Sequence, residues 1–177
     1  MGAYLPVLAD GASLPRTRQT QPGGRLIAVN SYKNGLNRVK YWAPVLVWAG
    51  VIFSFSTDHF SAPQTSRILG PLLHWLFPDI APEQVSLVQL AIRKLGHLTE
   101  YFILSALLLR AFHGESKYKA SFRSMAWTLA IMFIYAVGDE LHQSFVPNRT
   151  ASIYDVMIDN FGGACGTLWM YRRLRRR

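Results

Sequence analysis

The stretch MAWTLAIMFIYAVGDE, residues 125–140, decides the fold class of this chain. Residues 125–137 are uncharged and mostly apolar, and they end abruptly in a glycine and two carboxylates. Once flanking residues extend it, such a run suits a helix that crosses a bilayer. Three other largely apolar blocks lie at residues 41–56, 93–112 and 153–171, and the second of them begins in a charged sequence. The sequence therefore predicts an all-α fold, a polytopic membrane helix bundle with four transmembrane helices.

The segment between the first two blocks, residues 57–92, is broken by four prolines. Its middle, ILGPLLHWLF (68–77), is apolar but too short to cross a hydrocarbon core of ~30 Å. We therefore expect a re-entrant or interfacial segment there. The composition of both ends differs from that of the bundle. We assign residues 1–38 to a mobile basic cytoplasmic arm, residues 39–171 to the four-helix transmembrane domain, and residues 172–177 to an arginine-rich cytoplasmic tail.

The chain has 177 residues, half of them hydrophobic and 16% charged, with a formal net charge of +9. Such a charge is common in nucleic-acid-binding proteins. Here, however, the basic residues flank the apolar blocks, as the positive-inside rule predicts for a membrane protein. We therefore expect membrane lipids as partners and no nucleic acid. A single cysteine, Cys165, excludes an intramolecular disulfide and any two-cysteine metal or redox motif.

The Lys and Arg residues predict how the four spans are oriented. With four crossings, fifteen of the nineteen basic side chains fall on one side of the membrane. By the positive-inside rule that side faces the cytoplasm, so both termini are expected there. The basic residues left on the outer side are Arg67, Arg93, Lys94 and Arg149.

Polar residues gather at the span ends that this topology places outside. Ionisable groups at membrane depth usually face the bundle interior or a water-filled cavity. On the second span, the spacing puts Arg93, His97 and Glu100 on one helix face. We therefore expect an outward-facing polar pocket built by helix ends. Its other members are Tyr101, Asp139, Glu140, Gln143, Arg149, Ser152 and Asp155, with Asp159 and Asn160 a turn deeper on the last span.

Three strings carry a family resemblance: FSFST (53–57), RKLGHLTEYFILSALLLR (93–110) and YAVGDELHQSFVPNRTASIYDVMIDNFGG (135–163). They resemble the VanZ-like family of bacterial membrane proteins, over about residues 41–169. The family pattern has an arginine-lysine pair, a histidine, a glutamate-tyrosine pair, D-E-x-x-Q, and then a proline, an arginine, a serine and an aspartate. The matching residues are Arg93, Lys94, His97, Glu100, Tyr101, Asp139, Glu140, Gln143, Pro147, Arg149, Ser152 and Asp155.

The resemblance implies a multi-pass protein of the bacterial cytoplasmic (inner) membrane. The family is named after a member linked to resistance to teicoplanin, a glycopeptide antibiotic that acts on the cell wall. We therefore expect the pocket to act on, or to bind, a cell-envelope lipid or a cell-wall component.

The residue types in the pocket suit a membrane-embedded hydrolase or transferase. Imidazole and carboxylate groups are ligands for a divalent metal. Alternatively, the histidine is a general base that activates Ser152 or water. We take His97, Glu100, Asp139, Glu140 and Asp155 as the catalytic candidates, and Arg93, Tyr101, Gln143, Arg149 and Ser152 as the substrate-binding candidates.

Arginine side chains grip phosphate or carboxylate groups through a planar fork that lysine lacks. Arg149 lies in a turn that leads into a helix, where free backbone N–H groups also receive an anion. We therefore expect an anion clamp centred on Arg149, with Arg93 in a smaller role.

A non-catalytic interpretation remains open. In a membrane scaffold or ligand-binding protein, the same residues would form buried ion pairs that set the helix register. Ligand groups that converge on an open cavity with unpaired lone pairs would favour the enzyme. Closed ion pairs without a cavity would favour the scaffold. Whether a metal binds is also left open by the sequence.

Overall fold

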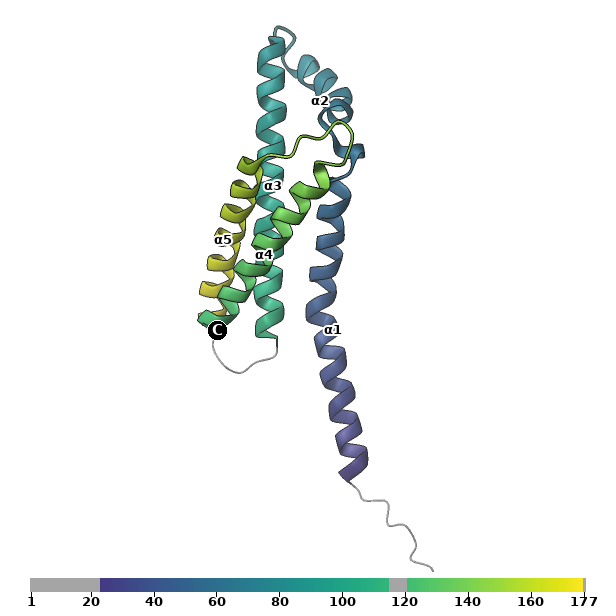
Figure 1. Cartoon of the computed structure of the whole chain (residues 1–177), viewed down its shortest axis with the longest axis vertical. Coiled ribbons are helices and arrows are strands. Elements are labelled where there is room, and N and C mark those ends of the chain that lie inside the picture. Colours follow the sequence, from purple (N-terminus) through teal and green to yellow (C-terminus); the bar gives the residue numbers. More distant parts are fainter. Residues whose placement is uncertain (1–22, 115–120, 177) are drawn as a thin grey trace, which may run out of the picture. The chain divides into compact units, whose positions relative to one another are not determined.

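The computed structural model describes residues 23–114 and 121–176, with side chains described from residue 38 onwards. Every regular element in these ranges is a helix (Figure 1), which confirms the all-α prediction. Residues Gly35–Arg177 form one compact unit. The elements are α1 (Gly23–Phe55), the short 3-10 helix η1 (Asp58–Phe60), α2 (Ala62–Leu76), α3 (Pro82–His113), α4 (Phe122–Gln143) and α5 (Ile153–Arg175).

The second predicted span begins earlier than its apolar block indicates. Helix α3 starts at Pro82, so the expected start at Arg93 is corrected to a position eleven residues before it. Proline is favoured in the first turn of a helix because the N–H that it lacks has no partner there. The side chain of Gln84 then accepts a hydrogen bond from the backbone N–H of Ala81 at 3.1 Å. The proline and this hydrogen bond favour a helix start at Pro82, which the hydropathy of the segment does not indicate.

Two other predicted segments are also helical. Residues 68–76 of the expected re-entrant or interfacial segment belong to helix α2. Helix α1 begins at Gly23, so residues 23–38 of the predicted mobile arm belong to a helix. Residues 1–22 of that arm lie outside the described residues, as does Arg177 of the predicted tail.

By length and apolar composition, α3 and α4 are the two described helices that can each cross a membrane. Residues Arg38–Phe55 and Asp58–Leu76 meet the same criterion only as a pair, bent by 69°, as in a broken span or a re-entrant segment. The structure thus supports two spans, or three if the bent pair counts as one. Helix α5 is not among them: its residues 153–170 hold two aspartates, an asparagine and three glycines, so their mean hydropathy is low.

Helix α3 is the central element, and α5 packs against it through glycines. A Cβ atom at Gly162 would overlap the carbonyl oxygen of Leu98, and one at Gly166 would overlap that of Phe102. Small residues spaced by four allow two helix backbones to approach closely. Since Asp155 and Asp159 precede Gly162 on the same face, this packing turns both carboxylates towards α3.

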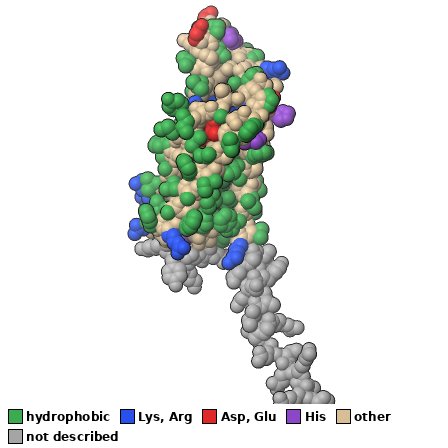
Figure 2. Space-filling view, viewed as in Figure 1, with side chains coloured by type: hydrophobic (Ala, Val, Ile, Leu, Met, Phe, Trp, Pro, Cys, Tyr) green, Lys and Arg blue, Asp and Glu red, His purple; other side chains and the backbone are tan. Residues whose placement is uncertain are grey.

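Apolar side chains cover the middle of the visible face, and several Lys and Arg gather towards its lower end (Figure 2). Leu46 and Ile134 are about 70% exposed, which is unusual for large apolar residues of a water-soluble protein. The buried core is formed instead by residues of four helices that face inwards, among them Ile52, Tyr101, Leu104, Met132 and Val156. An apolar exterior of this kind suits a lipid environment.

Candidate functional site

Four metal-ligand side chains meet between α3, α4 and α5. The candidate ligand atoms of His97, Asp139, Glu140 and Asp159 all lie within 4.8 Å of one another, and all four residues are buried. Three carboxylates so close together repel one another strongly in a medium of low dielectric. Such a cluster is stable only if protons or a cation offset the negative charge.

Each ligand comes from a helix that the packing holds in place. Helix α3 supplies His97, the end of α4 supplies the adjacent Asp139 and Glu140, and α5 supplies Asp159. Asp139 accepts hydrogen bonds from Ser56 and from Nε2 of Gln143, the latter at 3.1 Å. Since Ser56 follows the last residue of α1, these bonds connect the cluster to α1 as well.

The histidine is oriented by an aspartate. The Nδ1–H of His97 donates to Oδ1 of Asp159 at 3.1 Å. This assignment leaves Nε2 as the ring nitrogen with a lone pair. A carboxylate that holds the far nitrogen of a histidine is the usual arrangement around metal-binding imidazoles.

Two carboxylate oxygens of the cluster have no hydrogen-bond partner among the described residues. Oδ2 of Asp159 is buried and unpaired. In Glu140, Oε2 accepts from the backbone N–H of Ser152 at 2.7 Å, while Oε1 is buried and unpaired. A buried oxygen without a partner is costly, and hard or borderline divalent cations bind such oxygens. The residues present therefore fit a divalent cation.

A cavity of about 470 Å³ opens beside the cluster. Its polar wall includes His97 and Asp139 of the cluster, together with Glu100, Gln143 and two arginines. In Figure 2, acidic atoms reach the surface at one small spot within the apolar middle of the visible face. The other walls are largely apolar and come from α1, η1, α2 and α3: Ile52, Phe55, Phe60, Leu69, Leu90 and Ile92. The cavity is therefore amphipathic, and α2 forms one of its sides.

The two arginines of the cavity differ in their contacts. Arg149 donates through Nε and Nη2 to the carbonyl oxygen of Thr57 at 3.3 and 3.1 Å, and through Nη2 to that of Phe55. It thus holds the loop before α5 against the end of α1. Nε of Arg93 is buried and has no partner among the described residues.

The charges of the two guanidinium groups also influence each other. Burial lowers the pKa of Arg149, and the charge of Arg93 lowers it further. Two like charges at one cavity wall are stabilised when an anion lies between them.

The family model for VanZ/LLP1 matches residues 41–175. The chain belongs to the VanZ/LLP1 family. The match confirms the resemblance carried by the sequence motifs, and its range includes every residue of the ligand cluster and of the cavity lining. No curated protein and no solved structure is significantly similar to the chain.

The structure brings most of the predicted VanZ-like site residues together. His97, Asp139 and Glu140 lie in the ligand cluster. The cavity is lined by His97 and Asp139 again, and by Glu100, Arg93, Gln143 and Arg149.

Three predicted site residues belong neither to the ligand cluster nor to the lining of the cavity. Asp155 forms an ion pair with Lys94 and is not part of the cluster. Ser152 caps α5, its hydroxyl accepting a hydrogen bond from the backbone N–H of Tyr154 at 3.2 Å. Tyr101 is fully buried in the core, and its hydroxyl has no partner among the described residues.

Asp159 is a candidate ligand to which the sequence assigned no role beyond its place a turn deeper on the last span. The signal was present, because Asp159 follows Asp155 by four residues and therefore shares its helix face. The spacing within this helix does not show which residue of α3 each carboxylate faces. In the structure Asp155 lies level with Lys94, and Asp159 lies level with His97.

Proposed function

We propose that this protein is a membrane-embedded hydrolase that cleaves a phosphate ester of a cell-envelope lipid with the help of a divalent cation. The observation that carries the proposal is the buried cluster of His97, Asp139, Glu140 and Asp159, with unpaired carboxylate oxygens, beside a cavity that holds two arginines. The link between the VanZ family and glycopeptide resistance agrees with a substrate in the cell envelope.

The amphipathic cavity is the reason to propose a lipid. Arg93 and Arg149 would bind an anionic phosphate, and the apolar side chains of α1, α2 and α3 would contact hydrocarbon. A cation held by the four ligands would act as a Lewis acid towards a phosphate oxygen. Glu100 lines the cavity but is not a member of the cluster, so its carboxylate is placed to accept the proton of the attacking water.

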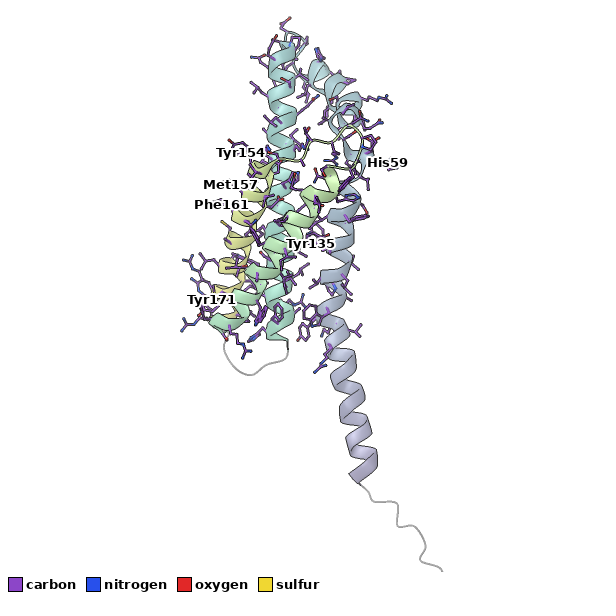
Figure 3. All side chains as sticks on the ribbon, viewed as in Figure 1. His59, Tyr135, Tyr154, Met157, Phe161 and Tyr171 are labelled. Carbon is purple, nitrogen blue, oxygen red and sulfur yellow. The ribbon has the colours of Figure 1, made fainter. Side chains whose placement is uncertain are left out.

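We also propose four spans with both termini in the cytoplasm, in the bacterial inner membrane. The distribution of basic residues supports this orientation. Helix α5 would then cross the membrane with its polar face inwards. In support, Figure 3 shows Tyr154, Met157 and Phe161 along its outer side, and all three are more than 60% exposed. Asp155, Asp159 and the glycines lie on the buried face.

A non-catalytic binding protein is the second candidate. The ion pair between Lys94 and Asp155 and the hydrogen bond from Ser152 to Glu140 are closed contacts, as expected of a scaffold. The unpaired oxygens of Glu140 and Asp159 favour the hydrolase over this alternative.

The test uses the full chain purified in detergent. We expect about one divalent cation per chain by elemental analysis, and release of phosphate from a phosphorylated envelope lipid that stops after chelation. Glu100→Gln keeps the shape of the side chain and removes its charge. It should retain the cation and lose at least ~100-fold in turnover. A cation-loaded protein without turnover of any phosphorylated lipid would favour the binding protein, and absence of a cation would refute the metal site.

A further inference from the structure

A second polar cavity lies at the opposite end of the bundle. It measures about 430 Å³ and is formed where α1, the end of α3 and the end of α5 meet. Its polar side chains are Tyr41, Arg110, His113 and Arg173. It shares no lining residue with the candidate hydrolase site.

The lining of this cavity is basic. Two arginines and a histidine line it, and no acidic side chain does so among the described residues. Arg172, Arg175 and Arg176 lie at the same helix end, which is also where Lys and Arg gather in Figure 2. A ligand for this cavity is therefore an anion.

Both guanidinium groups are held by aromatic rings. Arg110 stacks over Tyr41 with 5.6 Å between its Cζ atom and the ring centroid, and Arg173 stacks over Trp169 at 5.3 Å. Cation–π contacts of this kind restrict the side chain without occupying its N–H donors. The two guanidinium groups are thus partly oriented before a ligand binds. Such an arrangement suits a planar or tetrahedral oxyanion such as phosphate.

The same aromatic residues indicate the depth of the cavity in the membrane. Trp and Tyr concentrate at the level of the lipid head groups, and Tyr41, Trp42, Trp169 and Tyr171 all lie at this end of the helices. Trp42 also packs edge-on against Phe112, with ring centroids 5.4 Å apart. Basic pockets between helices at this level are suited to phospholipid head groups.

We propose that this cavity binds a phosphate-bearing anion, with the head group of an anionic membrane phospholipid as the nearest source. The proposal requires only that the bundle crosses a membrane, and it does not require the other site to be catalytic. A simpler explanation is that the basic residues merely offset the negative ends of α3 and α5. In that case Arg172, in the same last turn of α5 but outside the cavity, would serve equally well.

The test compares variants of the full chain in a neutral detergent by thermal unfolding. Phosphatidylglycerol is titrated in one arm, phosphatidylcholine in a second and inorganic phosphate in a third. We expect phosphatidylglycerol to raise Tm, and Arg110→Gln and Arg173→Gln each to require about fivefold more of it for the same rise. The matched control Arg172→Gln, with the same loss of charge, should change the requirement by less than about twofold.

Arg173 is exposed at the helix end, so its variant keeps the test valid if Arg110→Gln does not fold. Stabilisation by inorganic phosphate, with the same dependence on Arg110 and Arg173, would support the site and identify free phosphate as its source. An equal effect of Arg172→Gln, or equal stabilisation by phosphatidylcholine, would overturn the proposal. Metal content and lipid turnover of the other site should not change in any of these variants.

Discussion

Asp159 has no exposed surface, yet one of its carboxylate oxygens lacks a partner among the described residues. Its other oxygen holds His97, so the residue acts on the ligand set in two ways. Asp155, one turn earlier on α5, is buried as well but is neutralised by Lys94. The two aspartates therefore form a matched pair for mutation, with the same chemistry and different surroundings.

We expect Asp159→Asn to weaken binding of the divalent cation at least ~10-fold, because it removes a ligand charge and the orientation of His97. Asp155→Asn should retain the cation. It should instead lower the thermal stability, since it leaves the charge of Lys94 without its partner. Elemental analysis and thermal unfolding of the two purified variants measure these outcomes. Equal cation loss in both would show that the cluster is not a defined site.

The arginines of the cavity call for a different comparison. The sequence places the anion clamp on Arg149, whereas the structure also uses Arg149 to bind the carbonyl groups of Phe55 and Thr57. Nε of Arg93 is buried beside the same cavity and has no partner among the described residues. Arg149 is thus tied to the backbone, and Arg93 is the arginine that the proposed function assigns to the phosphate of the substrate.

We therefore expect Arg93→Lys to raise the KM for a phosphorylated lipid roughly tenfold at unchanged protein level. Arg149→Lys should lower stability by about 1–3 kcal/mol, because lysine cannot make the same hydrogen bonds to two carbonyl groups. Steady-state kinetics and thermal unfolding separate the two effects. If Arg149→Lys is stable but has a raised KM, and Arg93→Lys has an unchanged KM, then Arg149 and not Arg93 binds the phosphate.

Asn148 occupies a position in the loop before α5 that requires an unusual backbone conformation. Its φ is +59°, in the left-handed region that glycine adopts readily and asparagine tolerates. Its side chain also donates to Asp58 at 3.2 Å, which links the loop before α5 to η1. The loop before α5 therefore depends on a residue that tolerates a positive φ at position 148.

Among the elements, α3 and α5 determine the site through their mutual register. Lys94 meets Asp155, His97 meets Asp159, and Gly162 and Gly166 lie against the backbone of α3 further on. Residues later in α3 contact residues later in α5, so the two helices are parallel at this interface. A change in their separation would therefore displace Asp159 from the other ligands.

We predict that Gly162→Ala lowers the free energy of unfolding by about 1–3 kcal/mol, because its methyl group overlaps the carbonyl of Leu98. Gly50→Ala in α1 is the matched control, since a Cβ there meets nothing within 4 Å. It should be neutral or stabilising by up to ~1 kcal/mol. Thermal unfolding in detergent measures both, and a harmless Gly162→Ala would contradict the close packing of α3 and α5.

For the whole molecule, the proposed topology predicts where fused reporters work. A reporter active in the cytoplasm should function at residue 177 and near Lys117, and one active in the periplasm should function near Pro82. The reason is that fifteen of the nineteen basic residues lie on the predicted cytoplasmic side. A periplasmic reporter that works at residue 177 would place the last span differently and refute the four-span arrangement.

The sequence by itself determined the helical class, the apolar helices that suit a membrane and the family. These features depend on the chemistry of successive residues, such as the apolar run 125–137 and the motif residues from Arg93 to Asp155. Spacing along each helix also predicted which polar side chains share a face. Such properties are local, and they survive whatever the helix packs against.

Only the tertiary structure decided which polar residues meet. It placed Asp159 among the candidate ligands, paired Asp155 with Lys94, and brought α2 over the cavity as an apolar wall. These outcomes depend on the distance, rotation and register between helices. At the α3–α5 interface they are set by close contacts such as that of Gly162 with Leu98, between residues more than sixty positions apart. Spacing within a single helix contains no information about the level at which a neighbouring helix packs.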